Sequence, residues 1–436
     1  MNQIEYLNLD LFIYNITEGL PRNQNGVPNT YENYWLNILE SELKSKNLST
    51  EIKTNNSKWR TFKNTTTASV PVTGHYIWEK LYDDSDCLWF KCDIDQKIEL
   101  TDIASKVGEL KNNLVLPQVN PDIQPFPSYF GQTWMVSGWG FPANSPIPDQ
   151  ENLAGQIYKE LIKKEHQHKE LGNFLGSTIL EMWRGSEKWE GIEKDSHVLI
   201  ILYPDEAACI NGARYYNSWR DLFCCRNKII WAYEQGKKLK QSLLKEYKKS
   251  VIDNTSLPNL SQKDLLELKN ELQKNIDKMS SYVQNINLLA TQQHTVEVNL
   301  TNYKKLLDAY FLKNKLLKNF SNIVEKTYKV QLEKDYLSLN PGLAVLENIT
   351  TTIRGMVELE QAQRDRNLNN TVAIVGVGLA TSQIASSIII AQEPPPQYLP
   401  FFKTTAFWWS LATGIVASLI FWSILRLYSL ISRFRR

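Results

Sequence analysis

"TVAIVGVGLATSQIASSIII", residues 371–390, places Gly376 and Gly378 behind an apolar run, as the phosphate-binding turn of a dinucleotide-binding domain does. That motif also requires a third small residue, where Thr381 stands, and an acidic residue about 20 positions later. The next acidic residue, Glu393, is followed at once by three prolines, so no βαβ unit can follow. Residues 371–391 instead form an uncharged run of 21 residues, enough to cross the ~30 Å hydrocarbon layer of a membrane. We therefore predict a membrane-spanning helix.

A second uncharged segment, residues 405–425, follows after a 13-residue connection and carries Trp408 and Trp409 near one end. Tryptophan favours the membrane interface, where its ring meets apolar surroundings and its N–H meets water. Two such segments with a short connection predict a transmembrane helical hairpin. The alternative is a pair of buried core helices in a soluble protein.

Basic residues flank the two segments asymmetrically. Those before the first segment are Arg354, Arg364 and Arg366, and those after the second are Arg426, Arg433, Arg435 and Arg436. The connection holds only Lys403. By the positive-inside rule, residues 392–404 face outward and both termini are cytoplasmic. We predict a multi-pass protein of the inner (plasma) membrane.

Composition narrows the function classes. The chain has 436 residues and a formal net charge of +2, which gives no case for nucleic acid as a general partner. Its five cysteines have no CxxC spacing, which is typical of free thiols in the reducing cytoplasm: Cys87, Cys92, Cys209, Cys224 and Cys225. No catalytic dyad, P-loop or metal-ligand spacing emerges. We predict no enzymatic activity, no catalytic or metal-binding residues and no cofactor.

The amino-terminal part shows both strand and helix patterns. Alternation at Tyr6–Ile16 predicts a half-exposed strand, Cys87–Ile94 predicts a second, and the apolar His197–Asp205 predicts a third that is buried on both faces. Residues 151–184 have helical spacing. The predicted divisions are a cytoplasmic α/β domain (1–210), a long coiled-coil-like helical region (211–340), a stalk helix continuing into the first span (341–391), an outer loop (392–404), and the second span with a basic cytoplasmic tail (405–436).

Two segments are candidates for ligand binding. Residues 117–148 combine seven prolines with aromatic residues that include Trp134 and Trp139, a composition suited to a loop that stacks on a ligand or a neighbouring subunit. A long connection packed on its own domain is the alternative. Arg214, Arg220 and Arg226 could face an anionic ligand at a helix start, although their spacing of six also fits an ordinary amphipathic helix.

A repeat of alternating steps of three and four runs from Leu265 to Tyr328, and 15 of its 19 positions are apolar. With no proline or glycine in 261–340, it predicts either a coiled-coil helix continuous over 261–336, or a helical hairpin turning near residues 290–296. Asn340, Pro341 and Gly342 predict a break. A further helix from Leu343 can then enter the membrane as one rod with the first span. The predicted fold class is thus an α+β domain, long stalk or coiled-coil helices, and a C-terminal two-helix transmembrane hairpin.

Helical steps along the first span place four residues on one face: Gly376, Ala380, Gln383 and Ser387. Small residues let helices approach closely in lipid, and a mid-membrane glutamine is disfavoured against hydrocarbon. We predict that this stripe lines a pore at the axis of a homo-oligomer, with Gln383 as its narrowest polar ring. Packing of the stripe against the second span of the same subunit is the alternative.

The order of a cytoplasmic domain, stalk helices, two carboxy-terminal spans and the basic tail "RLYSLISRFRR" resembles the CorA-like superfamily of divalent-cation channels, over about residues 215–436. The resemblance is one of layout, because the Gly-Met-Asn selectivity motif is absent and its place reads "IIIAQEPPPQYLPFF". It implies a pentamer whose first span lines the pore, with a nucleotide or a divalent cation as ligand. Members without the motif include membrane effectors of antiviral defence in bacteria.

Two function classes follow. The first is a homo-oligomeric ion channel or membrane-permeabilising effector that is gated by its cytoplasmic domain. The second is a non-conducting membrane-anchored sensor or scaffold that recruits partners through its coiled coil. In both, the lipid bilayer is a partner.

Overall fold

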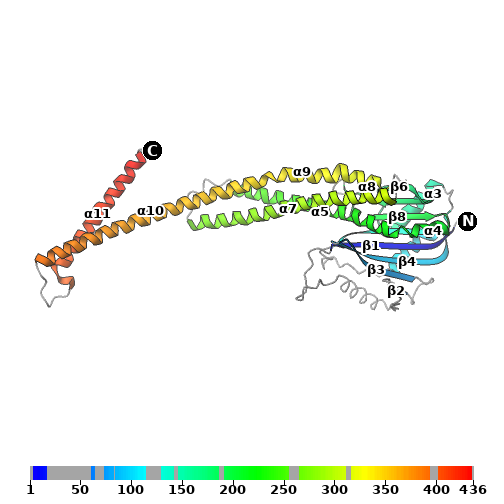
Figure 1. Cartoon of the computed structure of the whole chain (residues 1–436), viewed down its shortest axis with the longest axis horizontal. Helices are drawn as coiled ribbons and strands as arrows, with labels where there is room; N and C mark the ends of the chain where they lie inside the picture. Colours follow the sequence, from blue (N-terminus) through cyan, green and yellow to red (C-terminus); the bar gives the residue numbers. More distant parts are fainter. Residues whose placement is uncertain are drawn as a thin grey trace. The chain divides into compact units, whose positions relative to one another are not determined.

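The computed structural model describes residues 3–16, 60–63, 73–82, 84–113, 129–141, 146–185, 191–254, 265–310, 316–392 and 401–434. The chain forms two compact units. Unit 1 comprises Met1–Lys245 with Val283–Pro341, and unit 2 comprises Glu246–Tyr282 with Gly342–Arg436. A mixed β-sheet occupies the amino-terminal part, long helices follow it, and two apolar helices lie near the carboxyl end, which confirms the predicted order of parts (Figure 1).

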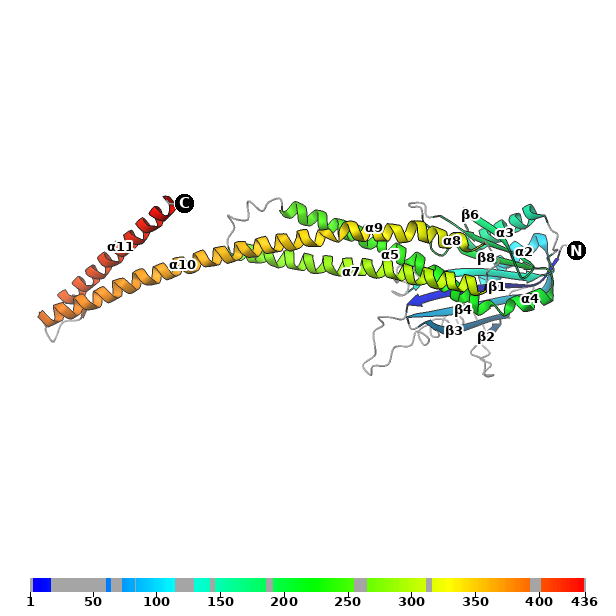
Figure 2. The same cartoon turned by 45° about the horizontal axis from the view of Figure 1, so that its top comes forward.

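The sheet of unit 1 has eight strands in the order β2-β3-β4-β1-β5-β8-β7-β6 (Figure 2). The strands are β1 (Gln3–Ile16), β2 (Arg60–Lys63), β3 (Thr73–Tyr82), β4 (Ser85–Glu99), β5 (Tyr129–Trp139), β6 (His168–Phe174), β7 (Ser177–Trp183) and β8 (His197–Tyr203). Neighbours are antiparallel except β5 and β8, which are parallel and pair Thr133 with His197. All three predicted strands exist, and every residue of β8 is buried as predicted. The prediction that the first strand is half-exposed is wrong, because β1 lies inside the sheet and is buried from Leu7 to Asn15.

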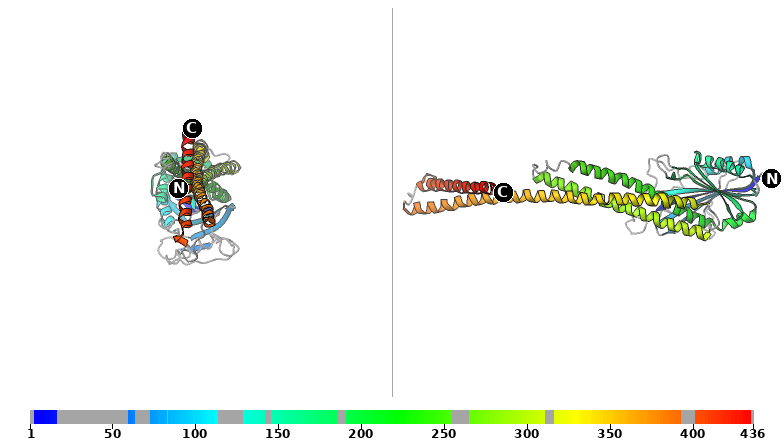
Figure 3. Two further views of the ribbon diagram at one scale, coloured as in Figure 1. Left: turned by 90° about the vertical axis from the view of Figure 1, so that its left-hand side faces the viewer. Right: turned by 90° about the horizontal axis from the view of Figure 1, so that it is seen from above.

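Helices cover both faces of the sheet. On one side lie α2 (Ile103–Asn113), which follows a short 3-10 turn (Leu100–Asp102), and α3 (Ile147–Ile162). On the other side lie α4 (Glu206–Ala213) and the first part of α5 (Tyr216–Asn254) (Figure 3). Because side chains alternate along a strand, each strand sends one set of residues to α2 and α3 and the other set to α5.

The face toward α2 and α3 is closed by one apolar cluster. Its strand members include Leu9, Leu11, Phe90, Val136, Val198 and Ile200, and its helical members include Val107, Ala154 and Ile157. The face toward α5 also buries aromatic rings, since Phe12 and His197 both contact Phe223 of α5. In addition it buries Asp10, Thr133, Ser137, Glu181 and His197, so polar and ionisable side chains lie within this second layer.

Two further sequence predictions about the strands of the sheet are wrong. Residues 129–139, predicted as part of a loop, form the central strand β5, because their alternating apolar side chains fill both faces of the sheet. The rest of that prediction falls partly on residues 117–128 and 142–145, which lie outside the described ranges. The helix predicted over 151–184 ends at Ile162, and β6 and β7 follow as a hairpin.

The hairpin turn has an identifiable cause. Leu175 and Gly176 have φ values of 52° and 81°, as a two-residue type I′ turn requires, and the Asn173 side chain accepts a hydrogen bond from the Gly176 N–H at 3.1 Å. Leucine is unusual at a position with φ above zero. The turn therefore lacked the Asn-Gly or Asp-Gly signature that would have revealed it in the sequence.

The long helices of unit 1 turn back on themselves. They are α5 up to Lys245, α7 (Leu265–Tyr310) from Val283 onward, α8 (Lys318–Ile323), a π-helical turn (Val324–Lys329) and α9 (Val330–Leu339). The prediction of one helix over 261–336 is wrong, since α7 ends at Tyr310 and Leu317 is left-handed with φ 68°. The alternative turn near 290–296 is also misplaced, because those residues lie inside α7.

Contacts confirm that the helices pair within the chain. Lys304 bonds Glu325 at 2.8 Å, Lys329 bonds Glu297 at 3.3 Å, and Tyr233 stacks on Tyr328 with ring centroids 3.9 Å apart. The repeat predicted as a coiled-coil seam is buried at Ile286, Leu289, Val296, Leu300, Tyr303 and Leu307. Within unit 1, the seam thus packs on helices of the same subunit.

Unit 2 contains the carboxy-terminal parts of the fold. The helix α10 (Pro341–Gln392) begins after Asn340, as the predicted break requires, although Asn340 keeps a right-handed helical conformation. The early part of α10 packs on the start of α7 through Leu268, Ile353 and Val357. A 3-10 turn (Phe401–Lys403) precedes α11 (Thr405–Phe434), which returns antiparallel to α10 (Figure 3). The centre of the predicted outer loop, residues 393–400, lies outside the described ranges.

Candidate functional site

Two helices are long and apolar enough to cross a membrane. Apolar windows lie within Lys318–Ile389 and Thr405–Leu427, with mean hydropathies of 1.8 and 1.7. The prediction that the first span joins a stalk helix without interruption is confirmed, because α10 is one helix from Pro341 to Gln392. Its large apolar side chains in the span are exposed in the single chain, among them Val372, Leu379 and Ile388.

Small residues join α10 to α11. The hydroxyls of Ser382 and Ser410 lie 2.9 Å apart, and the Ser418 hydroxyl donates to the Ile374 carbonyl at 3.3 Å. A Cβ added to Gly414 would lie 2.9 Å from the Gly378 carbonyl oxygen, so only glycine allows this approach of the two backbones. Close contact through Gly and Ser is the usual way in which membrane helices associate.

The predicted pore-lining residues lie on another face of α10. Successive helical residues are rotated by about 100°, so Gly376 and Gly378 point about 160° apart. Gly378 is buried against α11, whereas Gly376 has open space around it and Ala380, Gln383 and Ser387 are exposed. In the single chain the stripe therefore does not pack against the second span, which was the alternative to a pore. One face of α10 holds the hairpin together, and the opposite face is free for contacts with other molecules.

The three arginines that were candidates for an anion site are not brought together. Arg214 lies exposed after α4. Arg220 of α5 forms ion pairs with Glu79 of β3 and with Asp221. Arg226 is buried under the helical hairpin, with its guanidinium carbon 4.9 Å from the centre of the Phe320 ring. The structure therefore separates Arg214, at the end of α4, from Arg220 and Arg226 of α5, and does not gather the three around one ligand.

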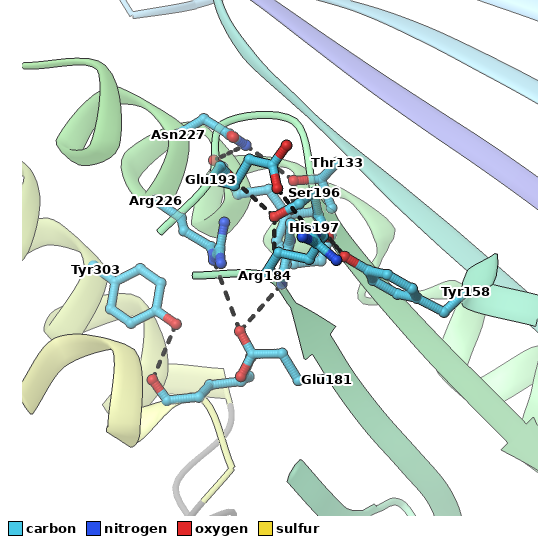
Figure 4. Close-up of polar contacts among 12 residues, drawn as sticks. Thr133, Tyr158, Glu181, Arg184, Glu193, Ser196, His197, Arg226, Asn227 and Tyr303 are labelled. Carbon is cyan, nitrogen blue, oxygen red and sulfur yellow. Dashed lines mark hydrogen bonds and ion pairs between the residues drawn. The ribbon is translucent and has the colours of Figure 1, made fainter. Parts of the chain in front are cut away.

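Arg226 belongs to a buried polar cluster that sequence reasoning missed (Figure 4). Glu181 of β7 lies between Arg226 and His197 of β8, with its Oε1 atom 3.7 Å from Arg226 Nε and 3.1 Å from His197 Nε2. All three side chains are at most 2% exposed. We define Glu181, His197, Arg226, Thr133 and Asn227 as the Glu181 cluster.

The hydrogen bonds of the cluster run in one direction. Asn227 donates its Nδ2–H to Thr133 Oγ1 at 2.9 Å, and Thr133 lies 3.1 Å from His197 Nδ1. Burial lowers the pKa of His197 well below its ordinary value, and nearby Arg226 lowers it further, so the imidazole is neutral. The network then assigns the proton to Nε2, which donates to Glu181, while Nδ1 accepts from Thr133.

Burial opposes both charges of the ion pair. It raises the pKa of Glu181 and lowers the pKa of Arg226, while the attraction between the two residues acts in the opposite sense. Arg226 Nε and Nη2 have no hydrogen-bond partner among the described residues. Because the desolvation of such a pair can outweigh its attraction, the pair is weak evidence of stability and better evidence of a specific arrangement.

A second polar group lies on the same face of the sheet. Trp89 donates its Nε1–H to Asp10 Oδ1 at 2.8 Å, and Asn8 donates to the Tyr216 hydroxyl of α5 at 3.1 Å. Burial raises the pKa of Asp10 to about 7, although Lys91 and the hydrogen bonds from Trp89, Asn8 and Tyr216 lower it. Asn8 Oδ1 and the Tyr203 hydroxyl are buried and have no hydrogen-bond partner among the described residues.

The aromatic candidates for ligand stacking belong to β5. Trp134 is 2% exposed and is part of the apolar cluster under α2 and α3, so the protein itself covers its ring. Trp139 is partly exposed at the end of the strand. The alternation of "YFGQTWMVSGW" was the signal for a buried strand, and the surrounding prolines masked it.

A hollow of about 450 Å³ lies between α3 and the start of β6. Its charged lining residues form two ion pairs with each other, Lys159 with Glu165 and Lys169 with Glu151, both at 2.6 Å. Nothing in this arrangement selects one ligand chemistry. Across the described residues, no three His, Cys, Asp or Glu side chains gather as a metal site would require.

No protein-family model matches this chain, and no curated protein matches its sequence.

Proposed function

We propose that this protein is a homo-oligomeric membrane channel or membrane-permeabilising effector, gated by its sheet domain. One observation carries the proposal: Gln383 lies exposed on α10, within an uncharged 21-residue run, on the side opposite to α11. A glutamine at mid-membrane is disfavoured against hydrocarbon and tends to face water or partner helices. Several copies of the chain supply both, because copies arranged as a ring around an axis enclose a polar path.

The proposed arrangement follows from the sequence. Both termini face the cytoplasm, residues 392–404 face outward, and the protein resides in the inner (plasma) membrane, since arginines flank the two spans on one side. The layout resembles the CorA-like superfamily, which favours a pentamer with α10 around the pore, and its divergent members suggest a role in antiviral defence. A coiled coil between the long helices of different copies would add to the assembly. The gating ligand in this proposal is a nucleotide or a divalent cation that binds the sheet domain.

Ion efflux from liposomes tests the proposal. Full-length protein is reconstituted in vesicles loaded with a fluorescent ion indicator, and efflux is compared between wild type and Gln383→Leu. We expect wild type to release ions and Gln383→Leu to alter the rate strongly, because an apolar ring replaces the polar one. Ser423→Ala on α11 is the matched control, since the Ser423 hydroxyl donates to the Leu419 carbonyl of the same helix at 2.8 Å, and its efflux should equal wild type. Equal ion efflux from wild type and Gln383→Leu would contradict the assignment of Gln383 to a pore.

The mass of the detergent-solubilised protein separates this function from a membrane tether. A pentamer, or another ring of several copies, supports a central pore. A monomer or dimer would contradict it, because two copies of α10 cannot enclose a path for ions. Such a result would favour the non-conducting sensor or scaffold.

A further inference from the structure

The turn between α7 and α8 is strained at a buried residue. Leu317 has φ 68° and ψ −18°, and its side chain is fully buried. This left-handed conformation is unfavourable for residues other than glycine, so the surroundings must hold it in place. The side chains that hold Leu317 in this conformation therefore fix how the chain enters α8.

Both backbone polar groups of Leu317 are held by buried side chains. Its N–H donates to the carboxylate of Glu181 on β7, and its carbonyl accepts from the Tyr303 hydroxyl of α7 at 3.0 Å. Phe320, in the first turn of α8, packs edge-on against the Tyr303 ring and lies over Arg226. The turn is thus attached to the sheet by one carboxylate and covers the guanidinium that balances its charge.

Glu181 gathers donors from several elements. His197 of β8 donates to it at 3.1 Å, Arg226 of α5 lies at 3.7 Å, and the Leu317 N–H comes from the turn. The remaining charged neighbour is Glu170 of β6, which bonds Asn319 of α8 and repels Glu181. Arg226 requires the negative charge of Glu181 as its counter-charge, and His197 and the Leu317 N–H donate to the same carboxylate. The incomplete hydrogen bonding of Arg226 among the described residues leaves the docked state only partly satisfied.

We propose that Glu181 is a positioning residue whose negative charge holds the strained Leu317 turn on the sheet, so that losing this charge undocks the turn together with α8. Without the carboxylate, Arg226 would be a buried charge with no counter-charge. Undocking lifts Phe320 away and lets water reach Arg226, so the turn opens while the sheet stays folded. The inference rests on the proposed function only for its consequence, which is that undocking transmits a signal from the sheet to the helices.

Hydrogen exchange of the full-length protein in detergent tests the proposal without any membrane readout. In Glu181→Gln we expect amides of residues 316–323 to exchange at least ~10-fold faster, because a charge-assisted hydrogen bond is lost, while amides of β5 and β8 keep their rates. Glu325→Gln makes the same chemical change in the exposed pair with Lys304 and should leave residues 316–323 unchanged. Glu181→Asp keeps the charge and should give rates between wild type and Glu181→Gln.

Two outcomes overturn the inference: unchanged exchange at residues 316–323 in Glu181→Gln, or equal acceleration throughout β5, β7 and β8. If Glu181→Gln does not fold, Tyr303→Phe replaces it, since this change removes only the hydroxyl bonded to Leu317. There we expect about fivefold faster exchange confined to the turn, the effect of one buried hydrogen bond, and unchanged exchange would overturn the proposal. Liposome efflux tests the proposed channel separately from hydrogen exchange. If wild type and the variants release no ions, the channel is refuted, and the exchange result for Glu181 is unaffected.

Discussion

The two faces of the β-sheet differ in what they bury. The face under α2 and α3 is closed by an apolar cluster that includes Val136, Val198 and Ile200. The face under α5 buries Asp10, Glu181 and His197 between its aromatic rings. Among the described strand residues, Asp86 is a buried acid on the apolar side, and it pairs with Asn15 at 3.2 Å. Apolar packing tolerates many arrangements of similar volume, whereas a polar network is satisfied in few.

The difference indicates separate tasks for the two faces. The apolar face supplies stability through burial, and the polar face fixes how α5 and the α7–α8 turn dock. An interface whose charges are only partly compensated can change state at a modest cost in free energy. This is the property that gating by the sheet domain requires.

Among changes on the two faces of the sheet, removing Arg226 should lower the free energy of unfolding most. In Arg226→Met, Glu181 loses its counter-charge, and we expect a loss of about 3–5 kcal/mol of unfolding free energy at pH 8. Ile200→Val on the apolar face is the matched control and should cost about 0.5–1.5 kcal/mol. Urea unfolding of the full-length protein in detergent, followed by near-ultraviolet circular dichroism, measures both. Equal losses would mean that the two faces do not differ energetically.

Asp10→Asn should have the next largest effect, in the opposite direction. The pKa of Asp10 is raised from 3.8 to about 7, so its charge costs stability above pH 7 and the cost declines as the pH falls toward 3.8. We expect the variant to be more stable than wild type by up to about 4 kcal/mol at pH 8. Asn8 can turn its unbonded Oδ1 toward the new amide.

The gap between Asp10→Asn and wild type should shrink by about 1.4 kcal/mol per pH unit below pH 7. Urea midpoints measured at pH 8, 6 and 5 follow this change. A gap that does not depend on pH would show that the pKa of Asp10 is not raised in the folded protein.

His197 should give a smaller, opposing pH dependence. Its pKa is lowered well below 6.5 by burial, so the folded protein keeps it neutral while the unfolded chain takes up a proton below pH 6.5. Its contribution to stability is therefore present above pH 6.5 and lost as the pH falls, by about 1.4 kcal/mol per unit. In wild type, Asp10 offsets this loss.

The loss of stability with falling pH that His197 causes should become measurable when Asp10 is replaced, because Asp10 no longer offsets it. We expect Asp10→Asn to lose stability from pH 6.5 to 5.5 relative to Asp10→Asn/His197→Gln, again by urea unfolding. Parallel pH profiles of the two variants would contradict a neutral, buried His197.

Local patterns in the sequence revealed the parts of the fold that depend on single segments. The uncharged runs gave the two apolar helices, alternation gave β1, and a nearly continuous apolar run gave β8. The α7–α8 turn could not be read, because a leucine takes the left-handed position where glycine would have been the signal. The Glu181 cluster was also invisible, since β7, β8, α5 and the turn meet only in the folded chain. The stripe that contains Gly376 was predicted from helical spacing, whereas only the structure showed that Gly378 lies on the opposite face, against α11.

The accessibility of substituted cysteines along α10 tests the central claim most directly. Single cysteines at positions 376 to 387 are treated with a membrane-impermeant thiol reagent in liposomes during efflux, against a low background because four of the five native thiols are buried. The account predicts that modification blocks efflux at Gly376→Cys, Ala380→Cys, Gln383→Cys and Ser387→Cys, and not at Ile384→Cys or Ser382→Cys. The pore assignment would be contradicted if the reagent blocked efflux at Ser382→Cys and at none of the four stripe positions. It would also be contradicted if the blocked positions showed no helical periodicity.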